Sequence, residues 1–94
     1  MAPQRLTDVE VKQQLQSLSR WQLKDGRLHC ELKFGSFVEA FGFLTSLALI
    51  AERMNHHPEI YNVYDRVRLE LWTHDANGIS PLDFELARAA EKLL

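Results

Sequence analysis

The segment "SFVEAFGFLTSLALIAERMN", residues 36–55, is the most apolar part of the chain and organises the elements on either side of it. Ser36 followed three residues later by Glu39 is a capping-box pattern, which is typical of the start of a helix. Pro58 disfavours helical geometry at the residue before it, so we expect the helix to end near Asn55. The pattern therefore predicts one long helix between these two signals.

Apolar residues lie on more than one side of this helix. One stripe contains Phe37, Phe41, Leu44, Ala48 and Ala51, and a second set, Val38, Phe43, Leu47 and Ile50, lies elsewhere. Such a pattern favours a helix that is covered by more than one partner. We expect one side to pack on a sheet and the other, through residues 37–54, to form the interface of a homodimer or homotetramer. The alternative, two sides buried within one small domain, is harder to arrange with only three helices.

A strand hairpin is predicted on each side of the long helix. Upstream, residues 20–24 and 27–34 bracket the Asp25-Gly26 pair, which favours a two-residue turn because Gly tolerates positive φ. Apolar and polar residues alternate along 27–34, which is typical of a strand with one buried face. Downstream, residues 60–64 and 66–74 form the second hairpin, with Val67, Leu69, Leu71 and Thr73 on one face.

Helix-start signals stand near both ends of the chain. Thr7 and Glu10 form a capping-box pattern that begins a helix over about 8–19. "SPLD", residues 80–83, supplies a serine cap, a proline at the first helical position and an acidic residue in the first turn of a last helix. The order α-β-β-α-β-β-α predicts an α+β fold, in which residues 1–94 form a single domain with helices over one face of a four-stranded antiparallel sheet.

Composition limits the class of partner. Eleven Lys and Arg residues against 13 Asp and Glu give a net charge of −2, so electrostatics indicates neither nucleic acid nor an anionic membrane as a partner. The longest uncharged run, residues 40–51, is too short to span a bilayer. Cys30 is the only cysteine and the first residues lack a secretory pattern, so we expect a soluble cytoplasmic protein with a buried, inert thiol.

Three histidines stand at loop edges: His56 and His57 after the long helix, and His74 at the end of the last predicted strand. Hairpin pairing brings the end of that strand towards the loop that holds the histidine pair. Imidazole can give and take a proton near neutral pH. Glu52 can orient one ring or pair with Arg53, and a lone Glu is more often simply solvated. A three-histidine metal site is the alternative, although adjacent histidines rarely chelate one ion well. An isolated histidine pair is more often exposed or a capping feature.

A family resemblance bears on these alternatives. "ERMNHHPEIYNVYDRVRLEL", residues 52–71, followed by "THD", "GIS" and Asp83, resembles the pterin-4a-carbinolamine dehydratase family, also known as the dimerisation cofactor of a hepatocyte nuclear factor. The resemblance extends from about Trp21 to Leu93. It implies dehydration of 4a-hydroxytetrahydropterin to quinonoid dihydropterin, in recycling of the pterin cofactor of aromatic amino acid hydroxylases. It implies a small-molecule pterin substrate and neither a metal nor an organic cofactor.

The resemblance also implies roles for the histidines. His57 would hold the substrate, while His56 and His74 would exchange protons with it. Glu52 matches the family's acidic position before the pair and would orient or charge-stabilise a histidine. His29, on the first hairpin, is expected to be irrelevant to activity.

The implied substrate-binding set contains Glu52, Asn55, Pro58, Ile60 and Asp83. Pro58 would fix the direction of the loop, and Asp83 would line the mouth of the site. The chain departs from the family at Ile60, where a Trp is familiar, at Asn55, where an acid is common, and at Leu82, where a base is expected. Trp72 shares a strand face with His74 and is the candidate to replace the missing aromatic wall.

The family offers a second class of function. It includes a transcription coactivator and dehydratase-like proteins associated with RuBisCO assembly, so the long helix can serve as a binding surface instead. The presence here of all three histidines favours catalysis, because a pure scaffold has no chemical need of them.

Overall fold

A computed structural model describes residues 3–94. Its elements are α1 (Asp8–Leu15), β1 (Trp21–Lys24), β2 (Arg27–Lys33), α2 (Phe37–Met54), β3 (Glu59–Val63), β4 (Arg66–Leu71), the short 3₁₀ helix η1 (His74–Ala76) and α3 (Pro81–Lys92). The predicted α+β class and the order α-β-β-α-β-β-α are confirmed, with η1 as an addition.

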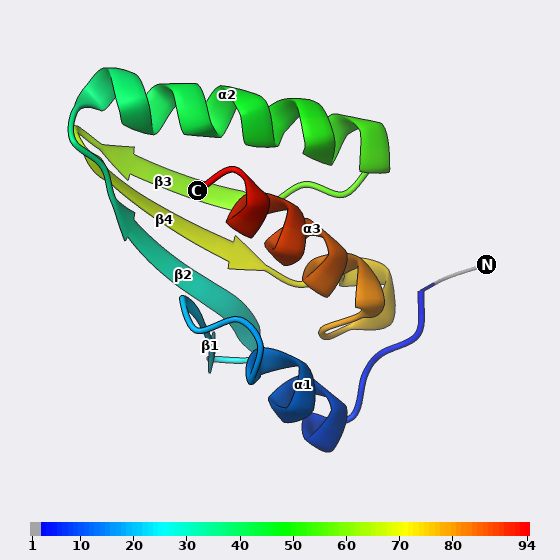
Figure 1. Cartoon of the computed structure of the whole chain (residues 1–94). Helices are drawn as coiled ribbons and strands as arrows, with labels where there is room; N and C mark the ends of the chain where they lie inside the picture. Colours follow the sequence, from blue (N-terminus) through cyan, green and yellow to red (C-terminus); the bar gives the residue numbers. More distant parts are fainter. Residues whose placement is uncertain (1–2) are drawn as a thin grey trace.

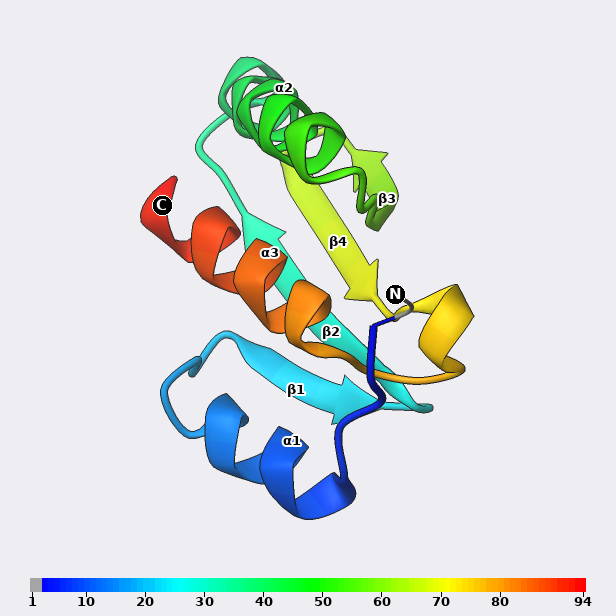
Figure 2. The same ribbon diagram turned by 90° about the vertical axis from the view of Figure 1, so that its right-hand side faces the viewer.

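The strands form one antiparallel sheet in the order β1-β2-β4-β3 (Figure 1). Asp25 and Gly26 both have positive φ, 53° and 76°, as the predicted two-residue turn requires. Figures 1 and 2 show α2 and α3 side by side over one face of the sheet, with α1 next to β1. The start of β3, the end of β4 and the start of α3 consequently lie at one end of the sheet.

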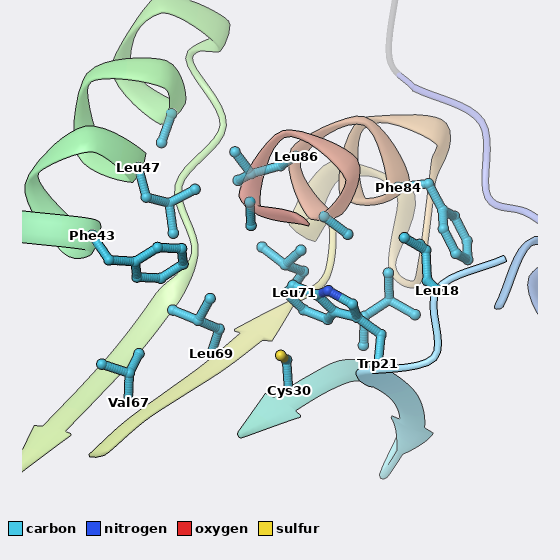
Figure 3. Packing of buried hydrophobic residues seen from close by; sticks show 14 of the residues in the cluster. Leu18, Trp21, Cys30, Phe43, Leu47, Val67, Leu69, Leu71, Phe84 and Leu86 are labelled. Atoms are coloured by element: carbon cyan, nitrogen blue, oxygen red, sulfur yellow. The ribbon is translucent and has the colours of Figure 1, made fainter. Parts of the chain in front are cut away.

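The core fills the space between the sheet and the helices (Figure 3). Leu28, Leu69 and Leu71 of the sheet, Leu47 of α2 and Phe84 and Leu86 of α3 are each at most 2% exposed. Cys30 lies in the same layer, and its burial raises the pKa of the thiol to about 12. The expectation of a buried, inert thiol agrees with this position.

Two elements end three or more residues earlier than the sequence predicts. Helix α1 ends at Leu15 rather than near residue 19, because the amides of the next residues turn back in tighter, i to i−3 hydrogen bonds. Strand β4 ends at Leu71 rather than at residue 74. Beyond it, the backbone of Thr73 pairs with that of Gly78, so the chain reverses direction between them through η1.

Helix α2 carries apolar residues on two sides, as predicted, and the edge of the core divides the first predicted stripe. Leu44 and Ala51 face the core, whereas Phe37, Phe41 and Ala48 of the same stripe are exposed. The helix is turned so that Leu47 points to the sheet, a rotation that apolar spacing alone does not define. The outer side therefore presents Phe37, Val38, Phe41 and Leu49 to solvent. Within residues 3–94, no helix is long and apolar enough to cross a membrane.

Candidate active site

The end of α2 directs the histidine pair. Asn55 adopts a left-handed conformation (φ 51°, ψ 42°), and its N–H donates to the Glu52 carbonyl at 3.1 Å. The N–H of His56 donates to the Ala51 carbonyl, also at 3.1 Å. This is the Schellman arrangement, which stops a helix sharply and satisfies its last carbonyls. His56 therefore leaves α2 at a defined angle, and the predicted helix end near Asn55 is confirmed.

His56 is held by a buried carboxylate from α3. Its Nε2 lies 2.6 Å from Oδ1 of Asp83, which is fully buried. The other oxygen, Oδ2, accepts hydrogen bonds from the Ser80 N–H at 2.9 Å and the Thr73 hydroxyl at 2.8 Å. Because donors already surround this carboxylate, the proton of a neutral His56 belongs on Nε2. Nδ1 is then the ring nitrogen left for chemistry.

His57 pairs with Glu52, which lies on the last turns of α2. Its Nε2 is 2.8 Å from Glu52 Oε1, and both side chains are exposed. Water screens such an exposed pair, so it adds little to stability. It nevertheless orients the imidazole, which is the role expected for Glu52 from the sequence.

His74 begins η1 and is exposed. Its ring meets the indole of Trp72 edge-on, with centroids 5.7 Å apart and planes at 86°. The Arg27 guanidinium lies 5.1 Å from the same indole. Trp72 therefore lies next to His74, as expected for an aromatic side chain that lines the site. The indole also contacts the positive charge of Arg27.

Hydrogen bonds join two of the three histidine positions indirectly. Asp83 contacts both His56 and Thr73, and Thr73 immediately precedes His74. In the part of the chain that the structure describes, no hydrogen bond connects one imidazole directly to another. The site therefore contains one acid–histidine pair at His56 and a second at His57. The third imidazole, that of His74, follows directly after Thr73, which is hydrogen-bonded to the Asp83 of the first pair.

The remaining predicted residues occupy different places. Asn55 terminates α2, Pro58 is half-buried before β3, and Ile60 of the edge strand β3 is 46% exposed opposite Leu69. Asp83 differs from the expectation that it lines the mouth. It is fully buried behind His56, because its capping position turns the carboxylate inward.

Sequence reasoning missed Thr73 and Ser80 as part of this cluster. The available signals were the position of Thr73 next to His74 and the capping box shared by Ser80 and Asp83. One surface hollow of about 540 Å³ lies between α2 and α3 and is lined by Ile50 and Arg88 among others, and a smaller one of about 130 Å³ includes Ile60 in its lining. Among residues 3–94, no three His, Cys, Asp or Glu side chains are arranged to hold a metal ion.

The fold and the paired histidines define a small α+β protein with two acid–histidine pairs at one end of its sheet. The model of the pterin 4 alpha carbinolamine dehydratase family matches residues 4–93, and the chain belongs to this family. A relative from Rhizobium johnstonii is 52% identical over 94 residues, covering 98% of this chain and 93% of its own length. One from Solibacter usitatus is 48% identical and covers 95% and 94%. Both are named, provisionally, as pterin-4-alpha-carbinolamine dehydratases.

Solved structures agree on the fold. A transcriptional coactivator/pterin dehydratase from Brucella melitensis is 41% identical, with a TM-score of 0.92 over 95% of this chain and 97% of that one. A pterin dehydratase-like protein described as a RuBisCO assembly factor in the alpha-carboxysome is 27% identical, with a TM-score of 0.64 over 79% and 86%. Catalytic and assembly roles are thus both named among proteins of this fold.

Proposed function

We propose that this protein dehydrates 4a-hydroxytetrahydropterin to quinonoid dihydropterin and water, and so serves the recycling of the pterin cofactor used by aromatic amino acid hydroxylases. The observation that carries the proposal is the buried His56–Asp83 contact at 2.6 Å. A histidine backed in this way is the arrangement of a general base, since the carboxylate orients the ring and stabilises its charged form.

The chemistry requires two proton transfers and no redox partner. The bond between C4a and the hydroxyl oxygen breaks with both electrons leaving on oxygen, and an acid supplies the proton that makes water. The lone pair of the adjacent ring nitrogen forms the new C=N bond, and a base removes the proton from that nitrogen. Imidazole suits both transfers at neutral pH.

The proposed roles are those that the family resemblance implies, and the contact between Glu52 and His57 supports one of them. His56 and His74 exchange the two protons, and His57, oriented by Glu52, holds the substrate. Asn55, Pro58 and the exposed Ile60 complete the binding surface, while Asp83 acts from behind His56. Ile60 gives the pterin ring only aliphatic contact, so affinity depends on the polar residues and on the Trp72 edge.

Stopped-flow spectroscopy of freshly generated 4a-hydroxytetrahydropterin tests the proposal. Wild type should accelerate water loss, and His56→Ala, His57→Ala and His74→Ala should each reduce the rate strongly while the circular dichroism spectrum is retained. The matched control is His29→Gln, because His29 lies on β2 and contacts Glu70 at 3.0 Å instead of the site. A folded triple-alanine variant with the wild-type rate would refute the catalytic role of these histidines.

A second candidate function is a binding or assembly module, and the exposed side of α2 favours it. Phe37, Val38, Phe41 and Leu49 leave an apolar surface that we propose is covered by another copy in a homodimer or homotetramer, in the cytoplasm. Native mass spectrometry with wild type and Phe41→Asp tests this. A monomeric wild type would contradict the self-assembly, and a folded, catalytically inactive wild type would favour the binding role.

A further inference from the structure

A chain of hydrogen bonds lies behind His56 that the proposed reaction does not itself require. The Leu82 N–H donates to Ser80 Oγ at 3.2 Å, and Ser80 Oγ lies 2.7 Å from Thr73 Oγ1. Thr73 Oγ1 donates to Asp83 Oδ2 at 2.8 Å, and Asp83 Oδ1 accepts a hydrogen bond from His56 Nε2. Ser80 and Asp83 are fully buried, and Thr73 is 4% exposed.

The direction of this chain is determined by counting protons. A hydroxyl has a single hydrogen to donate, and that of Thr73 goes to Asp83. In the contact between the two hydroxyls, Ser80 must therefore be the donor and Thr73 the acceptor. Ser80 in turn accepts from the Leu82 amide. Every donor points the same way, towards the Asp83 carboxylate.

This direction has a consequence for His56. The Thr73 hydroxyl and the Ser80 amide both donate to Oδ2 and so favour the ionised carboxylate, which has no hydrogen of its own, and its other oxygen can then only accept from the imidazole. The ring is then confined to the tautomer with hydrogen on Nε2. Removing the Thr73 hydroxyl leaves Oδ2 with one donor and frees the carboxylate to rotate about its broad terminal torsion.

A purely structural role accounts for only part of the cluster. The capping box of α3 explains the contacts between Ser80 and Asp83, which satisfy the first amides of the helix. It does not involve Thr73, which comes from the segment after β4. Burying a hydroxyl there costs free energy unless it is hydrogen-bonded, and Val would fill the same space without that requirement. The placement of the hydroxyl therefore needs a reason beyond the cap.

We infer that Thr73 is a positioning residue: oriented by Ser80, its hydroxyl holds Asp83 so that His56 keeps its proton on Nε2 and presents Nδ1 to the substrate. This inference rests on the proposed dehydration for its kinetic consequence. Its structural consequence, the tautomer of His56, is independent of any substrate.

Two variants and a matched control test the inference. Thr73→Val removes the hydroxyl at similar volume, and Thr73→Ser retains a donor. Thr45→Val removes a hydroxyl that bonds only to the Phe41 carbonyl on the exposed side of α2. Imidazole nitrogen–proton correlation NMR at alkaline pH reads the tautomer of His56, and stopped-flow kinetics reads kcat, KM and their pH dependence.

The expected result is a neutral His56 protonated at Nε2 in wild type, Thr73→Ser and Thr45→Val, and a mixture of tautomers in Thr73→Val. The kcat of Thr73→Val should fall roughly tenfold with little change in KM, as expected for one lost hydrogen bond to a charged acceptor. Its pH–rate profile should shift, and Thr73→Ser should restore both the rate and the profile.

A wild-type His56 protonated at Nδ1, or a folded Thr73→Val with the wild-type tautomer and profile, overturns the inference. If Thr73→Val does not fold, Ser80→Ala disorients the same hydroxyl, and the wild-type tautomer still decides the matter. A wild type that lacks dehydration but shows the Nε2 tautomer lost in Thr73→Val supports the positioning role and removes the proposed function.

Discussion

Replacing Asp83 with Asn tests the acid–histidine pair most directly, because Asn keeps the shape of the side chain and removes its charge. Oδ2 of Asp83 accepts hydrogen bonds from two donors, and Oδ1 accepts one from His56. The single oxygen of Asn best satisfies the two donors, so its NH₂ group faces His56. Nε2 must then accept, and the ring proton moves to Nδ1, the atom that the proposed reaction uses as a base.

The magnitude follows from this tautomer exchange. Loss of one hydrogen bond to a charged group is worth about 1.5–3 kcal/mol, which corresponds to roughly 10- to 150-fold in rate. The equivalent exchange in a serine protease triad, which also inverts the tautomer, lowers kcat by about 10⁴-fold. We expect the kcat of Asp83→Asn to fall by about 100-fold or more. Stability should fall by about 1–3 kcal/mol, because the site is buried.

The assay is stopped-flow dehydration across pH 6–9, with urea denaturation to confirm that the variant is folded. Asp75→Asn is the matched control, since Asp75 is an exposed acid on the neighbouring η1. Its rate should equal that of wild type. A folded Asp83→Asn within about threefold of the wild-type rate throughout this range would show that the buried carboxylate does not set the state of His56.

The other predictions concern the core and the sheet. Leu69→Ala, at a position with no exposed surface, should cost about 2–5 kcal/mol of unfolding free energy, against less than about 0.5 kcal/mol for Val9→Ala at an exposed position of α1; equal losses in urea denaturation would contradict the core assignment. The hydrogen bond from His29 holds the pKa of Glu70 below its usual 4.5, so this carboxylate stabilises the fold above that pH and loses its contribution as pH falls through the lowered pKa. The difference in unfolding free energy between wild type and Glu70→Gln should therefore shrink on acidification. A difference that widens would contradict the predicted sign of this pH dependence. Cys30, with its thiol pKa raised to about 12, should resist a disulfide reagent at pH 8 until urea unfolds the protein, and immediate reaction would show an open thiol.

Much of the fold is predictable because its signals are local. Positive φ at Asp25 and Gly26 depends on the turn residues themselves, and alternation along β4 depends on which residues avoid water. The capping boxes likewise operate within a few residues. The rotation of α2 is different, since it depends on which surfaces meet, and the apolar spacing of that helix is compatible with more than one orientation.

The site divides in the same way. Sequence alone determined that the chain carries a histidine pair after a long helix, an acid one turn before it and a third histidine after the last strand, and the resemblance to a family followed from those residues. Only the tertiary structure decided that Asp83 turns inward to His56 and that Thr73 joins it, while Glu52 reaches His57. The physical reason is that a hydrogen bond between residues 27 positions apart, such as that of His56 and Asp83, depends on how α2, β4 and α3 pack, and no local pattern in the chain encodes it.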